Sequence, residues 1–144
     1  MIFLDANVFI RYLVEPVTPQ DQIMENQAAA LFQQVRDGKV EVTTSEATIA
    51  EVVCILSSKK HFNTPRSTVV TVLKPLLRSN AFRFASKAIC LNALNIWEGQ
   101  PRLTFPDSLA AAHSERFGYA LATFDERLGR LTSIDRYRFL ETEP

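Results

Sequence analysis

The sequence has no excess of charge of either sign, because 16 lysines and arginines balance 16 aspartates and glutamates. A chain without a basic field is a poor candidate for tight, non-specific DNA coating, so any contact with nucleic acid must use a local patch. The sequence also has only two cysteines, Cys54 and Cys90, both within apolar helical stretches. We expect both to be small buried residues rather than disulfide or metal partners, which favours a reducing cytoplasm.

Two kinds of targeting segment are missing as well. No basic leader precedes an apolar run at the N-terminus, and no apolar run approaches the length of a membrane span. The 144 residues are 47% hydrophobic and 22% charged, which predicts one globular domain over residues 1–144. We expect residues 141–144 to form a loose tail.

Apolar periodicity and turn signals divide the chain into alternating strands and helices. This alternation predicts a three-layer α/β/α fold with a central, mostly parallel sheet of about five strands. The expected strands are residues 2–5, 40–43, 82–85, 119–124 and 137–140. The expected helices are residues 7–14, 21–37 capped by Asp21, 45–60, 65–78 capped by Thr64, 86–98, a helix from 104–107 to Gly118, and a short helix after Asp125.

Four acidic residues occupy positions that ordinary surface charge does not explain. Asp5 and Asp125 each end an expected strand, at the sheet edge where open α/β folds bind ligands. Asp107 lies in the first turn of a helix, and all three could simply cap the helices that follow. Glu51 lies within the apolar stretch of helix 45–60, where we expect it to point inward and to need a compensating partner.

A bound divalent cation would offset the electrostatic repulsion between these carboxylates. Carboxylates without histidine or cysteine companions suit a hard ion such as Mg²⁺ or Mn²⁺. Asn7 and Thr123 lie two residues from Asp5 and Asp125 and could brace those carboxylates or a bound water, although a structural hydrogen bond explains each equally well. Glu46 is the competing acid of helix 45–60, and we interpret it as a helix-start residue.

Together these residues resemble a known family. Asp5 in IFLDANVF, Glu51 in SEATIAEVVCIL, Asp107 in FPDSLAAA and Asp125 in LATFDERL resemble the four-acid signature of PIN-domain nucleases, and Thr123 also fits. In its small size the chain is most similar to the VapC-type toxins of toxin–antitoxin pairs. The resemblance implies a Mg²⁺- or Mn²⁺-dependent ribonuclease, a homodimer, an antitoxin partner and a cytoplasmic location.

The expected reaction is hydrolysis of an RNA phosphodiester by a metal-activated water. Phosphate contacts would come from nearby cations, for which the candidates are Arg11, Lys59, Lys60, Arg127 and Arg130.

Three other interpretations compete with the nuclease. A receiver domain would need a lysine at the end of a late strand, and a haloacid-dehalogenase-like phosphatase would need an acid where Asn7 stands. The stronger alternative is a catalytically silent PIN-like module that binds RNA or protein.

Overall fold

The computed structural model describes residues 1–142, which contain seven helices and two short parallel strands, both in the first third of the chain. The expectation of a loose tail at 141–144 therefore lies partly outside the described residues. The elements in chain order are β1 (Ile2–Phe3), α1 (Ala6–Leu13), α2 (Pro19–Arg36), β2 (Val42–Thr43), α3 (Glu46–Ser57), α4 (Arg66–Arg78), α5 (Lys87–Gly99), α6 (Phe105–Phe117) and α7 (Glu126–Gly129).

The helices begin and end at local signals that the sequence carries. A capping box starts α2, where Thr18 accepts from the backbone N–H of Asp21 and the Asp21 carboxylate accepts in return. Asp21 is therefore the third helical residue and not the predicted cap. Thr64 is not the cap of α4 either, because Pro65 occupies that position and offers no side-chain hydrogen bond. Gly118 ends α6 with φ +66°, a left-handed conformation that favours glycine.

The strands are much shorter than the sequence predicts. β1 and β2 pair in parallel, with Ile2 opposite Val42 and Phe3 opposite Thr43. The expected strand at 82–85 is reduced to a parallel bridge between Val42 and Phe82, and those at 119–124 and 137–140 to a parallel bridge between Leu121 and Arg136. Within residues 1–142 these pairings do not join into one five-stranded sheet. Apolar alternation establishes that a segment can be a strand, but the strand forms only where a partner lies beside it.

The described chain has one large hydrophobic cluster and one small one. The large cluster gathers buried side chains of α1 to α6 around β2, with Phe9 packed on Phe32 and Phe82 at ring-centroid distances of 5.7 and 5.9 Å. Cys90 belongs to this cluster, as expected. Cys54 is exposed, so its predicted burial was wrong.

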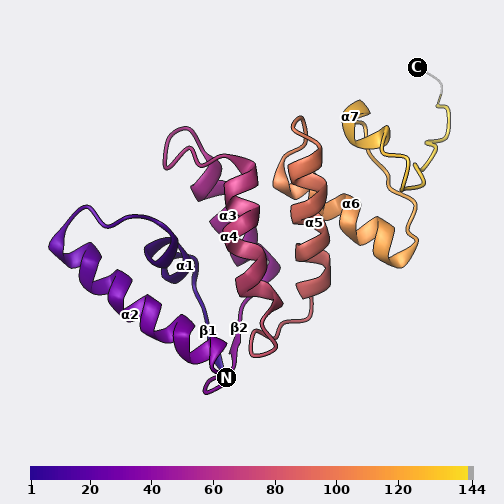
Figure 1. Ribbon diagram of the computed structural model, residues 1–144. Coiled ribbons are helices and arrows are strands. Elements are labelled where there is room, and N and C mark those ends of the chain that lie inside the picture. Colours follow the sequence, from indigo (N-terminus) through magenta and orange to yellow (C-terminus); the bar gives the residue numbers. More distant parts are fainter. Residues whose placement is uncertain (143–144) are drawn as a thin grey trace.

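The small cluster anchors the end of the chain. We call residues 119–142 the C-terminal arm. Leu103, Ala111 and Leu128 are buried together, and Leu121 of the arm packs against them. In Figure 1 the arm lies at the upper right beside α6, whereas β1 and β2 lie at the lower centre, with α3, α4 and α5 between them. The arm is therefore attached to its own chain far from β1.

No helix within residues 1–142 combines the length and the apolar character that a membrane crossing requires.

Candidate active site

Asp5 stands where β1 ends and α1 begins. Its Oδ1 accepts a hydrogen bond from the Ala6 backbone N–H at 2.8 Å, so the carboxylate caps α1. The residue is exposed, and its backbone is held by Leu4, which is buried. Asn7 is exposed in the first turn of α1 and lines a cavity of about 350 Å³ between α1 and α2. No side-chain hydrogen bond joins Asn7 to Asp5 in the described chain, so its bracing role stays a prediction.

Glu51 lies on α3 with its side chain exposed, so the prediction that it points inward was wrong. α3 buries Thr48, Val52 and other residues on one side. Ala47, Glu51 and Cys54 follow one another at helical spacing on the uncovered side, and all three are exposed. The helical spacing of Ala47, Glu51 and Cys54 in the sequence indicates this exposed side. The prediction of burial relied instead on the apolar composition of the whole helix.

Glu46 makes the contact that joins α3 to α6. Its Oε1 lies 2.6 Å from Nε2 of His113, and both side chains are about one third exposed. Glu46 does begin its helix, as expected, but it also fixes α6 against α3. The two residues are 67 positions apart, and no pattern in the sequence indicates the pair.

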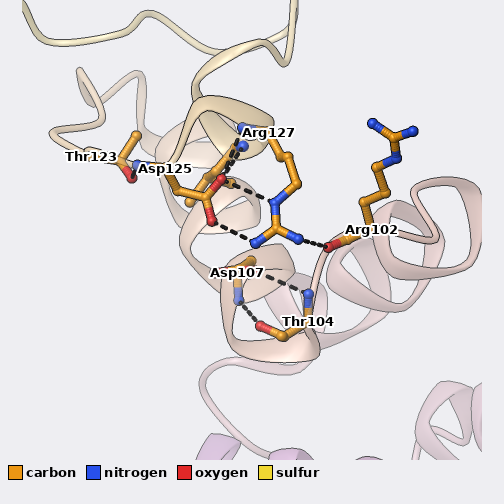
Figure 2. A network of polar contacts seen from close by, with 7 residues as sticks. Arg102, Thr104, Asp107, Thr123, Asp125 and Arg127 are labelled. Atoms are coloured by element: carbon orange, nitrogen blue, oxygen red, sulfur yellow. Dashed lines mark hydrogen bonds and ion pairs between the residues drawn. The ribbon is translucent and has the colours of Figure 1, made fainter.

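Asp107 is the third residue of α6 and closes a capping box with Thr104. The Thr104 hydroxyl accepts from the Asp107 N–H at 3.2 Å, and the Asp107 carboxylate accepts from the Thr104 N–H at 3.0 Å. Figure 2 shows this box at the start of α6. The helix dipole favours a carboxylate at this position.

Asp125 caps α7 and is held from several directions. Its Oδ1 accepts from the backbone N–H groups of Arg127 at 2.8 Å and Leu128 at 3.3 Å. Its Oδ2 lies 3.3 Å from Nη2 of Arg127. The hydrogen bond from the Arg127 side chain and those from the two backbone N–H groups hold the pKa of Asp125 below its usual value. The Thr123 hydroxyl accepts from the Asp125 N–H at 3.0 Å and braces the turn.

Arg127 connects this turn to the loop before α6. Its Nη1 donates to the Arg102 carbonyl at 3.2 Å while the rest of the guanidinium contacts Asp125 (Figure 2). Arg127 therefore joins the turn that contains Asp125 to the loop that precedes α6, the helix that contains Asp107. Beside them is a cavity of about 580 Å³ lined by Arg102, Arg127 and Arg130, with Gln100, Thr132 and Ser133. Sequence reasoning found Arg127 and Arg130 and missed Arg102, which is distant from both along the chain.

The remaining cations predicted to bind RNA are placed differently. Arg11 is already paired, with its Nη1 2.7 Å from the Asp21 carboxylate. Lys59 and Lys60 are exposed in the loop after α3. These three lie on elements that precede α4, and none of them lines the arginine cavity.

The four acids thus fall into two pairs. Arg127 joins the Asp125 turn to the loop before α6, the helix that begins with Asp107, whereas Asp5 and Glu51 are exposed at the start of α1 and on α3. Across residues 1–142, no three acidic, histidine or cysteine side chains come close enough to share a metal ion. The donor types fit a hard divalent ion, but their placement within one described chain does not.

Comparison with protein-family models finds a family that covers most of this chain. A family model described as "PIN domain" matches residues 2–133. The match includes all four acids and both the β1 region and most of the C-terminal arm. No curated protein matches the sequence.

Proposed function

Because the chain belongs to the PIN domain family, we propose that it is a metal-dependent endoribonuclease that hydrolyses RNA phosphodiester bonds. Proteins of this family are typically nucleases and commonly depend on divalent metals. We assign the metal ligands to Asp5, Glu51, Asp107 and Asp125, and the ion to Mg²⁺ or Mn²⁺. Four hard oxygen donors without a histidine or thiolate favour these ions over zinc.

The observation that carries the proposal is the contact of Arg127 with Asp125 and with the loop before α6, beside an arginine-lined cavity. Arg127 holds the Asp125 carboxylate in place, and its hydrogen bond keeps the pKa of that carboxyl below its usual value. Arg102 and Arg130 line the same cavity and can bind phosphate oxygens through charge-assisted hydrogen bonds. A carboxylate that could hold a divalent ion therefore lies next to arginines that could bind phosphate, which supports the proposal. Within residues 1–142 the four ligands are divided, so one chain by itself does not gather all of them around an ion.

The other candidate function is a catalytically silent module that binds RNA or protein. One observation favours it, because Asp5, Asp107 and Asp125 each serve a helix N-terminus and so have a structural role without any metal. The arginine cavity would serve such a module equally well.

A cleavage assay separates the two functions. The purified protein should cut single-stranded RNA with Mg²⁺ or Mn²⁺ and stop when EDTA is added. Asp5→Asn and Asp125→Asn should each abolish cutting and leave the fold intact, because asparagine also caps helices well. Glu98→Gln is the matched control, since Glu98 is an exposed acid at the end of α5. Full activity in either asparagine variant rules out the assigned site, and metal-independent RNA binding without cutting supports the silent module.

The family resemblance to VapC-type chains carries three further proposals. The protein is the toxin of a type II toxin–antitoxin pair, it binds a cognate antitoxin, and it acts in the cytoplasm as a homodimer. Co-purification of the neighbouring gene product with this chain tests the partner.

A further inference from the structure

The edge of β1 that faces away from β2 is unpaired. The Ile2 N–H donates to Glu41 at 3.1 Å and the Leu4 N–H to Thr43 at 2.9 Å. Groups of successive residues in a strand point to alternate sides, so the N–H and C=O of Phe3 face the other way. No strand of residues 1–142 lies there. The Phe3 side chain is 58% exposed, and a bare apolar strand edge is a site where another strand adds.

The C-terminal arm carries a second unpaired edge that matches the first. The Leu121 N–H donates to Asp135 at 2.7 Å, and the Leu121 carbonyl accepts from Tyr137 at 2.8 Å. By the same alternation, the backbone groups of Ala122 and Phe124 face away from this pairing. The Phe124 side chain is 83% exposed. Phe124 stacks on Phe139 at a ring-centroid distance of 4.4 Å, so an exposed apolar side chain flanks this unpaired edge, as Phe3 flanks that of β1.

The two edges fit in one particular register. Each of the two extended segments leads into an aspartate that caps the next helix, Asp5 for α1 and Asp125 for α7. Parallel alignment of these ends puts Phe3 opposite Thr123, so that the Phe3 N–H meets the Ala122 carbonyl. The same alignment puts Asp5 opposite Asp125 on one face of the sheet.

We infer that the arm of a second copy of this chain pairs with β1, so that each active site takes Asp5 from one chain and Asp125 from the other. The arm does not lie beside its own β1 in this structure, because Leu128 and Leu121 pack it against Ala111 of α6, with helices between (Figure 1). Pairing in both directions is a closed two-fold exchange. It joins Phe82, β2, β1 and the two extended arm segments into one sheet, which agrees with the mostly parallel sheet of about five strands that the sequence predicts.

A cysteine cross-link tests the exchange without reference to activity. Phe3→Cys and Thr123→Cys are combined in a Cys54→Ser chain, since directly opposed residues of neighbouring strands satisfy disulfide geometry. The expected result under oxidation is a band at twice the 16.3 kDa chain mass on a non-reducing gel. Phe3→Cys with Thr132→Cys is the matched control and should stay monomeric. A cross-linked monomer means that the arm pairs with its own β1, and an absent cross-link means that the edges do not pair; either result overturns the inference.

Complementation tests the shared site, and this part rests on the proposed nuclease function. When Asp5→Asn and Asp125→Asn chains are co-expressed, each mixed dimer holds one site with both native aspartates. Random pairing should restore about a quarter of the wild-type cleavage rate. Asp5→Asn co-expressed with Glu51→Gln is the control, because both changes then fall on the β1 side and no native site forms. Inactivity of the mixed dimer overturns the shared site. If the wild-type chain does not cut RNA, the nuclease proposal fails, and the cross-link still decides the exchange.

Discussion

Replacement of Leu128 by alanine should release the C-terminal arm without unfolding the rest of the protein. Leu128 is 6% exposed and packs in a cluster that contains only two other buried residues, Leu103 and Ala111. A buried leucine-to-alanine change costs about 2–5 kcal/mol, and a small cluster near the surface can partly collapse around the gap. We therefore expect the free energy of arm opening to fall by about 2–3 kcal/mol.

Hydrogen exchange of individual amides measures this opening. The Leu121 and Tyr137 amides report on the arm, because their N–H groups donate at 2.7 and 2.8 Å to carbonyls within it. A loss of about 2–3 kcal/mol corresponds to exchange faster by roughly 30- to 150-fold in Leu128→Ala. The amides of α3 and α5 should exchange at wild-type rates, because their side chains pack in the large cluster.

The matched control is Leu73→Ala, which removes a fully buried side chain from the large cluster. It should lower the global unfolding midpoint and leave exchange in the arm nearly unchanged. The reasoning is refuted if Leu128→Ala accelerates exchange in α5 as much as in the arm, because the two clusters would then unfold as one. Unchanged exchange at Leu121 and Tyr137 would refute it too, since the small cluster would not be the anchor.

Three further predictions concern charged groups. Arg66→Lys should lower the melting temperature by about 6 °C, because the guanidinium donates to three backbone carbonyls at the end of α5 and just beyond it, at 2.7, 2.9 and 3.3 Å, and their loss costs about 2 kcal/mol; calorimetry of wild type and variant checks this. The double variant Arg102→Ala, Arg130→Ala should bind a single-stranded RNA more weakly. The slope of its affinity against salt concentration should fall by the amount that about two phosphate contacts contribute, as measured by fluorescence anisotropy. Because Arg127 lowers the pKa of Asp125 in the folded chain, the stability from this pair is present above the unfolded pKa of about 4 and is lost as pH falls below it. Urea unfolding between pH 6 and pH 3 should therefore show a weaker pH dependence in Asp125→Asn than in wild type.

The helices could be predicted from the sequence because their signals are local. A capping threonine, an acid three residues later and a proline in the first turn are enough to start α6 at its observed place. Gly118 similarly ends it. The strands could not be predicted to the same standard, because a strand such as 119–124 needs a partner that sequence alone does not supply.

The candidate site shows the same difference between local features, which the sequence predicted, and long-range contacts, which it did not. The sequence predicted which acids stand at helix starts, and Asp5, Asp107 and Asp125 do stand there. The sequence did not predict that the Glu51 side chain is exposed, because the apolar residues around it suggested a helix buried on all sides. Nor could it predict that Arg127 reaches the Arg102 carbonyl, a contact between residues 25 positions apart.

Helix capping and metal binding are compatible roles for these acids. A cap fixes the side-chain rotamer, and the positive end of the helix dipole lowers the cost of bringing carboxylates together. Asp5 uses Oδ1 to cap α1, and no hydrogen bond within residues 1–142 occupies its Oδ2. Its capping role therefore does not count against the nuclease. The nuclease requires in addition that the segment ending in Asp125 lies beside the segment ending in Asp5, because a shared ion needs both carboxylates within reach.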